Sequence, residues 1–168
     1  MKKHQSTIGK NDEWLTPPEI LKALFDASGM MFGLDPCNAV NAPPQFRYSA
    51  FSLTEGGLEF DWSPYSVWVN PPFNRYERPK WMKKISEHNN GILLVPAACE
   101  TDAFYKYVWG KASGILFLKG RPHFHYADGT KAKANSGCTI CLISYGKQHL
   151  KTLQNSGLGY TIDLITNP

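Results

Sequence analysis

The sequence predicts an α/β protein, with a mostly parallel sheet covered by helices on both faces and an antiparallel hairpin toward the C-terminus. Short apolar runs alternate with segments of helical periodicity along most of the chain. Turn sequences rich in proline directly follow three of these apolar runs. The 168 residues contain no repeat, low-complexity tract or linker, so we expect one domain over 1–168, with a polar, flexible segment at 1–12.

Four segments carry helix signals. The first helix is expected to begin with Thr16 as its N-cap, Pro17 as its first residue and Glu19 completing a capping box. Apolar residues at helical spacing follow: Ile20, Leu21, Leu24 and Phe25. The remaining helices are predicted at 79–88, 101–111 and 147–155.

Strands are predicted wherever an apolar run is short and ends in a turn. The predicted ranges are 31–35, 66–70, 91–95, 115–118, 122–126, 138–144 and 159–165, whereas 38–65 reads as turn-rich and irregular. Asp35-Pro36-Cys37, Asn70-Pro71-Pro72-Phe73 and Val95-Pro96-Ala97 each follow one of these strands. If the three strands are parallel, their turns share one edge of the sheet, which is where ligands bind in such folds.

Composition excludes several classes of protein. Hydrophobic residues make up 42% and aromatic residues 13% of the chain, which disfavours disorder. No apolar run approaches the roughly 20 residues that span a bilayer, and no apolar stretch follows the N-terminal residues as in a secretory signal. We therefore expect a cytoplasmic protein. The net charge of +4 permits a polyanionic partner without requiring one.

The four cysteines, Cys37, Cys99, Cys138 and Cys141, do not form a recognisable metal site. Cys138 and Cys141 have Cys-x-x-Cys spacing, but they lie in a predicted strand that turns them to opposite faces. The His123/His125 pair is strand-like as well. We expect reduced core cysteines and no metal.

No glycine-rich phosphate loop is present, which disfavours cofactors held by a pyrophosphate but allows a cofactor without phosphates.

Asn70-Pro71-Pro72-Phe73 is the motif that carries most chemistry. The two prolines fix the backbone and donate no N–H, so the Pro71 carbonyl is free to accept a hydrogen bond. The Asn70 amide oxygen is a second acceptor, and Phe73 offers an aromatic face. Two acceptors aimed at one amino group, beside a face for a planar base, suit methylation of an exocyclic amine. The alternative is a turn that merely ends the strand.

A larger pattern joins this motif. Trp14-x-Thr16-Pro17-Pro18, Leu34-Asp35-Pro36-Cys37, Asp61-Trp62 and Asn70-Pro71-Pro72-Phe73 occur in the order found in S-adenosylmethionine-dependent amino-methyltransferases. The chain most closely resembles the phage-type DNA N6-adenine methyltransferases (Dam-like), from about residue 12 to 145, with Leu93–Ala97 and Lys119–Arg121 included. The resemblance implies a Rossmann-like methyltransferase fold, S-adenosylmethionine as cofactor and a flipped-out adenine as target. It also suggests a phage origin and action in the host cytoplasm.

The resemblance further implies roles for individual residues. Asn70 and Pro71 would accept hydrogen bonds from the target amino group, next to Pro72, while Phe73 stacks on the base. Asp35 would face the ammonium of the cofactor, and Asp61 its adenine. The full set implied to bind the cofactor is Trp14, Thr16, Pro17, Asp35, Pro36, Cys37, Asp61 and Trp62. The usual Gly-x-Gly turn after Asp35 is missing, and turn or helix caps are the structural alternatives for Asp35, Asp61 and Thr16.

A chain of this length leaves no room for a separate target-recognition domain, so recognition must come from loops. Two basic loops stand out, at 74–80 and 121–136. The residues expected to contact nucleic acid are Arg75, Arg78, Lys80, Arg121, Lys131 and Lys133. The same loops could instead be ordinary solvated connections. The expected partner is double-stranded DNA, with no membrane and no obligate protein partner.

The motif alone leaves other acceptors open: RNA adenine, cytosine N4 or a protein glutamine. The basic, aromatic loops favour nucleic acid over glutamine. A non-catalytic nucleic-acid-binding module is a further alternative, which the intact Asn70-Pro71-Pro72-Phe73 motif disfavours and which cofactor binding without transfer would support.

Overall fold

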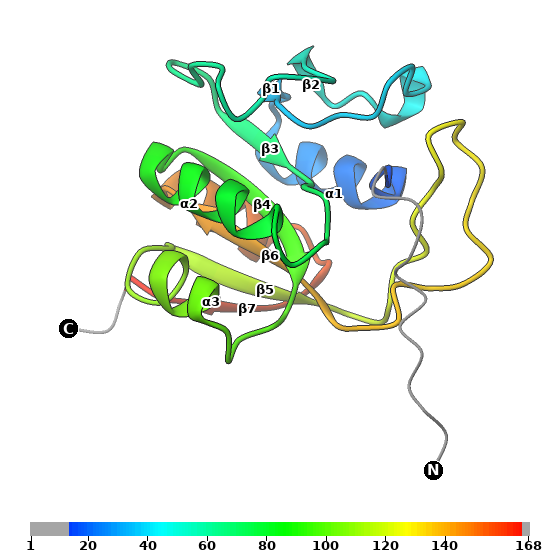
Figure 1. The fold of residues 1–168 in the computed structure, drawn as a ribbon. Helices are drawn as coiled ribbons and strands as arrows, with labels where there is room; N and C mark the ends of the chain where they lie inside the picture. The colour runs from blue at the N-terminus through cyan, green and yellow to red at the C-terminus, as the bar shows by residue number, and fades with distance from the viewer. Residues whose placement is uncertain (1–13, 166–168) are drawn as a thin grey trace.

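The computed structural model describes residues 14–165, so the segment 1–12 that we expect to be flexible lies outside the described residues. One seven-stranded sheet runs through the molecule in the order β2-β1-β3-β4-β6-β5-β7 (Figure 1). The strands are β1 (Phe32–Asp35), β2 (Ser49–Ser52), β3 (Val67–Val69), β4 (Gly91–Pro96), β5 (Gly114–Leu118), β6 (Ile140–Tyr145) and β7 (Gly159–Asp163).

The sheet divides into a parallel and an antiparallel half. Strands β2, β1, β3 and β4 are parallel to one another. Strand β6 lies antiparallel between β4 and β5, and β7 pairs antiparallel with β5 at the edge. The predicted mixed α/β class, with its antiparallel pairing toward the C-terminus, is confirmed.

Helices cover both faces of the sheet. They are α1 (Pro18–Ser28), α2 (Arg78–His88), α3 (Asp102–Tyr107) and α4 (Lys147–Asn155), with a 3-10 turn η1 (Pro44–Phe46). Because side chains alternate along a strand, β4 sends Ile92 and Leu94 into the core beneath α1 and α4. Leu93 and Val95 enter the opposite core beneath α2 and α3. Each face of the sheet is thus buried by its own pair of helices.

Four local expectations are wrong. Thr16 does not cap α1: the cap is Pro17, held out of the helical region at ψ 129° because Pro18 follows it, and no side chain caps the helix. Residues 122–126 are not a strand, since His125 makes only isolated bridges, to Leu15 and Lys131. The segment 38–65 contains β2 and η1, and α3 is shorter than predicted.

The helices are short. The longest of those described, α1 and α2, have 11 residues each. A bilayer requires about 20 apolar residues in a helix. Within residues 14–165, no helix combines the length and the hydrophobicity needed to cross a membrane.

Candidate active site at the carboxyl edge of the sheet

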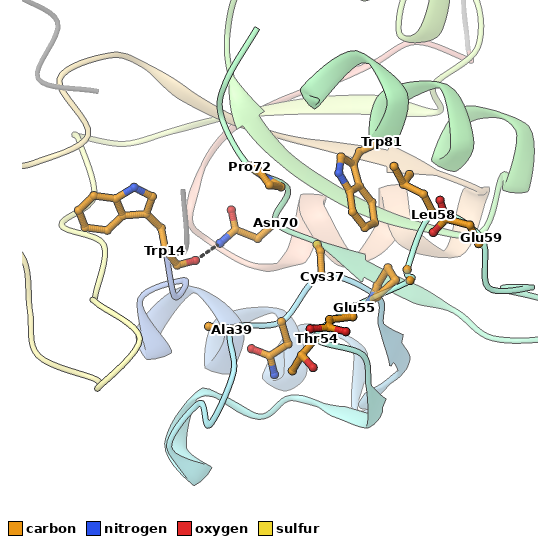
Figure 2. Close-up of a pocket in the computed structure, with 14 residues that line it drawn as sticks. Trp14, Cys37, Ala39, Thr54, Glu55, Leu58, Glu59, Asn70, Pro72 and Trp81 are labelled. Atoms are coloured by element: carbon orange, nitrogen blue, oxygen red, sulfur yellow. Dashed lines mark hydrogen bonds between the residues drawn. The ribbon is translucent and has the colours of Figure 1, made fainter. Parts of the chain in front are cut away.

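Two of the three predicted turns line one cleft. Strands β1, β3 and β4 are parallel, with Leu34 beside Val67 and Val67 beside Gly91, so their carboxyl ends lie at the same edge. The cleft there has a volume of about 290 Å³ (Figure 2). The turns after β1 and β3 contribute Pro36, Cys37, Asn70 and Pro72. The turn after β4 does not reach it, because the segment before β6 covers that turn through a hydrogen bond from Ala97 N to Thr139 O.

The Asn70 side chain is held from one side only. Its Nδ2 donates to the main-chain carbonyl of Trp14 at 2.7 Å (Figure 2). Its Oδ1 is buried and has no hydrogen-bond partner among the described residues. A buried acceptor without a partner costs about 1–3 kcal/mol. Such an atom is a reason to look for a ligand, and here it belongs to the residue on which the sequence motif centres.

Asp35 lies beside Asn70 in a second, small cavity of about 10 Å³, which Trp14 and Thr16 also line. Its carboxyl group is buried and accepts a hydrogen bond from Cys37 N at 3.2 Å. Burial raises the pKa of Asp35 to about 7, and this hydrogen bond opposes the rise only partly. A cation placed next to the carboxyl group would restore its charged form.

Part of the cleft comes from residues 54–59, which follow β2 and for which the sequence predicted no site residue. Because β2 is parallel to β1, it ends at the same edge and places Glu55 and Glu59 in the cleft wall (Figure 2). A side chain at Gly57 would put its Cβ 1.8 Å from Pro36 O, so only glycine fits there. The cleft lining that the sequence did not indicate is Asn38, Ala39, Thr54, Glu55, Gly56, Gly57, Leu58, Glu59 and Trp81.

Asp61 and Trp62 do not line either cavity. Asp61 is exposed and accepts a hydrogen bond from Ser63 N at 2.9 Å, as a turn cap does. Trp62 is buried, and its Nε1 donates to Gly57 O at 2.8 Å. Its ring stacks on that of Trp81, with the ring centroids 6.3 Å apart. Trp62 therefore supports the cleft wall from beneath. Pro17 is buried and also lines neither cavity.

The two remaining members of the Asn70 motif do not line the cleft. Pro71 is buried and Phe73 is half-buried. The Phe73 ring meets Phe124 edge to face, with ring centroids 5.5 Å apart. Phe124 comes from the long connection between β5 and β6, so that connection packs against the motif.

One arginine of each basic loop lies near Cys138. Burial raises the pKa of Cys138, and the positive charges of Arg121 and Arg78 oppose that rise, so both guanidinium groups are near one thiol. Arg75 contacts the Tyr76 hydroxyl and ring, and Lys80 pairs with Glu77 at 2.8 Å. Arg121, Lys131 and Lys133 are exposed, and no ion pair involves them within residues 14–165.

A comparison with protein families shows which family the chain belongs to. The model of the family described as DNA N-6-adenine-methyltransferase (Dam) matches residues 3–156. The chain belongs to this family. The predicted resemblance is thereby confirmed, and the family implies methylation of adenine N6 in DNA in general. Searches of curated proteins and of solved structures gave no significant match.

The family match spans the whole candidate site. It includes Trp14, both cavities, the Asn70 motif and the two basic loops, and it ends at the C-terminus of α4. In this DNA N-6-adenine-methyltransferase family member the cysteines lie in two cores, Cys141 beneath α2 and α3 and Cys138 beneath α1 and α4. Among residues 14–165, no three His, Cys, Asp or Glu side chains lie together as metal ligands would.

Proposed function

We propose that the protein transfers a methyl group from S-adenosylmethionine to N6 of an adenine flipped out of duplex DNA. One observation carries the proposal: the buried, unpartnered Oδ1 of Asn70 at the edge of the cleft. An amino group with two N–H donors is the natural partner for this oxygen and for the neighbouring Pro71 carbonyl.

The residues present fit S-adenosylmethionine, which supplies an electrophilic methyl group when bound. A cleft of about 290 Å³ is close to the lower end of ligand pockets, roughly 300 Å³. Asp35, whose buried carboxyl group would regain its charged form beside a cation, would hold the ammonium group with Thr16 nearby. Glu55 and Glu59 would hold hydroxyl groups of the ribose, against the apolar walls of Trp81 and Pro72. Asp61, which was expected at the adenine of the cofactor, lines neither cavity.

Asn70 and Pro71 would act on the substrate by hydrogen bonding alone. When Asn70 Oδ1 and the Pro71 carbonyl accept the two N–H groups of the amine, the nitrogen lone pair leaves conjugation with the ring. The nitrogen would then take the methyl group as the bond from that carbon to the sulfonium sulfur breaks, leaving a neutral thioether, and it would release one proton. That proton would pass to water, because neutral amide oxygens are too weakly basic to keep it. The chain contributes alignment and electrostatics rather than a covalent intermediate.

The basic loops would hold the DNA while the base leaves the stack. Extrusion of a base costs a few kcal/mol. Stacking on an aromatic ring recovers about 1–3 kcal/mol. Phe73, which is half-buried and follows Asn70 by three residues, would offer that ring. Arg75, Arg78, Lys80, Arg121, Lys131 and Lys133 would contact phosphates, and the paired Lys80 would contribute least.

The test is tritiated methyl transfer from S-adenosylmethionine to unmethylated duplex DNA, with the modified nucleosides resolved after digestion. Wild-type protein should form N6-methyladenine, and Asn70→Ala should transfer at least roughly 100-fold more slowly, as when one stabilising hydrogen bond is removed from an active site. Asn155→Ala, an exposed asparagine at the end of α4, is the matched control and should keep the wild-type rate.

Cofactor binding, measured by calorimetry, separates the outcomes. Asn70→Ala should bind S-adenosylmethionine within a few-fold of wild type. Label in cytosine N4, in RNA only, or in no nucleic acid despite a bound cofactor would overturn the assignment of DNA adenine.

A further inference from the structure

The orientation of the Asn70 amide depends on one main-chain carbonyl. Trp14 O accepts from Asn70 Nδ2 at 2.7 Å, which leaves Oδ1 as the free acceptor. If the amide were flipped by 180°, two oxygens would face each other at this distance. The position of Trp14 O therefore decides whether Asn70 presents an acceptor or a donor to the substrate.

Trp14 is in turn held by the connection between β5 and β6, residues 119–139, here called the arm. Leu15 N donates to His125 O at 2.9 Å and His125 N donates to Leu15 O at 3.1 Å. The Trp14 and Tyr126 rings lie against each other, with centroids 5.1 Å apart. Figure 2 shows the Trp14 carbonyl directed at Asn70 and its indole pointing away, so the ring and the carbonyl have different partners.

The arm is a folded-back hairpin rather than a loose loop (Figure 1). Ser136 N bonds to Pro122 O, Ala132 N to Phe124 O and Tyr126 N to Thr130 O, all at 2.8–2.9 Å. At its tip Asp128 Oδ1 accepts from Thr130 N at 2.8 Å and from the Thr130 hydroxyl at 2.7 Å. The arm carries the basic residues Lys119, Arg121, Lys131 and Lys133 against one acidic residue, Asp128.

The two sides of the arm, one with Lys131 and the other with Tyr126, are joined directly. Lys131 forms an antiparallel bridge with His125, the residue before Tyr126. A force applied to the arm by bound nucleic acid would therefore reach Tyr126, then Trp14, and then the amide of Asn70. The Tyr126 ring is 42% exposed and makes no side-chain hydrogen bond within the described residues, so ring packing is its contribution.

We propose that Tyr126 is a positioning residue for methyl transfer: it packs on Trp14 and so holds the carbonyl that orients the Asn70 amide. The arm would then serve both to bind DNA and to complete the acceptor. This inference rests on the proposed function for its effect on rate, but not for the packing of Tyr126 on Trp14 or the hydrogen bond from Asn70 to the Trp14 carbonyl.

The first measurement needs no activity. In a ¹H–¹⁵N correlation spectrum, the signals of the Asn70 side-chain amide are identified as those that disappear in Asn70→Ala. One of its two protons should be hydrogen-bonded and exchange slowly with water. Tyr126→Ala and Tyr126→Leu should each speed this exchange by about ten-fold and shift the pair of signals. Tyr126→Phe, which keeps the ring, and Tyr160→Ala, an exposed tyrosine on edge strand β7, should leave the signals unchanged.

The second measurement is single-turnover methyl transfer to duplex DNA. Tyr126→Ala and Tyr126→Leu should lower the rate between about ten-fold and a hundred-fold, as small misplacements of a reacting group do. The Kd for S-adenosylmethionine and for DNA should stay within about two-fold, and Tyr126→Phe should restore the rate.

The two measurements separate the two claims. An unchanged Asn70 amide signal in Tyr126→Ala would overturn the positioning role, as would a changed signal with an unchanged rate. If wild-type protein binds the cofactor but does not methylate DNA, the proposed function fails, while the amide signal still decides whether Tyr126 positions Asn70.

Discussion

At the scale of single residues, the site stores two unfavourable arrangements side by side. Asn70 Oδ1 is buried without a partner, and the Asp35 carboxyl group is buried with only one hydrogen bond. Each costs stability, because a buried polar group loses its water. A ligand that supplies an amino group to one and a cation to the other would recover that cost on binding.

The pH dependence of stability tests the burial of Asp35. Its pKa is raised from 3.8 to about 7, so between these values the folded state holds a proton that the unfolded state has lost. The free energy of unfolding of the cofactor-free protein should therefore fall as pH rises from about 4 to 7 and level off above 7. At about 1.4 kcal/mol per pKa unit, the contribution is roughly a few kcal/mol.

Asp35→Asn should remove this slope, because asparagine does not titrate yet can still accept from Cys37 N. The variant should be more stable than wild type at pH 8. It should also bind S-adenosylmethionine at least ten-fold more weakly, because the loss of an ion pair at a buried site removes roughly 1.4 kcal/mol or more of binding free energy. Urea unfolding at pH 5 and pH 8 measures the first effect. Asp26→Asn, at an exposed position on α1, is the control and should keep the wild-type slope. If Asp35→Asn also kept that slope, the assignment of the pH dependence to Asp35 would be contradicted.

At the scale of elements, burial decides what the sequence could reveal. Six strands lie within two residues of their predicted bounds, because they are apolar runs that end in turns. Strand β2 was missed because Ser49–Ser52 is short, polar and largely exposed, with none of the apolar signal on which prediction relies. Residues 122–126 alternate like a strand, but their alternation reflects packing of the arm on Leu15 and Phe73.

The same limit applies to the site. The turns at Asp35 and Asn70 were predictable because each follows a recognisable strand. Glu55 and Trp81 were not predictable. Glu55 reaches the cleft because β2 pairs with β1, and Trp81 reaches it because α2 packs over Gly57. The acceptor for Asn70 Nδ2, Trp14 O, is 56 residues away in the chain and has no local signature.

The salt dependence of DNA binding tests the arm as an element. Lys131 and Lys133 are exposed and form no ion pair within the described part of the chain. If both contact phosphates, Lys131→Ala/Lys133→Ala should weaken binding to every sequence and reduce the slope of log K against log salt by about 2. Fluorescence anisotropy over a salt titration measures this slope. Lys106→Ala/Lys111→Ala, on and after α3, is the charge-matched control, and an equal loss in both variants would contradict a specific role for the arm.

At the scale of the whole molecule, β4 joins the two cores. Leu93 and Leu94 are fully buried on opposite faces of the sheet. Each substitution to alanine should lower the free energy of unfolding by about 2–5 kcal/mol, as cavities in well-packed cores do. Tyr160→Ala, on edge strand β7, should change it by about 0.5 kcal/mol or less.

Denaturant unfolding followed by circular dichroism and by tryptophan fluorescence measures these effects. A single transition in both signals, lowered by either leucine variant, would support the expected single domain. A small effect of one leucine alone would mean that its face of the sheet does not share the cooperative transition.

The arm also has a consequence for engineering. Its contacts run to residues elsewhere in the chain: Tyr126 to Trp14, His125 to Leu15 and Phe46, and Phe124 to Phe73. A hairpin exchanged between homologues to alter target choice would arrive without these partners and leave Trp14 unsupported. The arm is therefore not a module that can be transplanted alone; a graft must carry the receiving residues around Trp14 and Phe46 along with the hairpin.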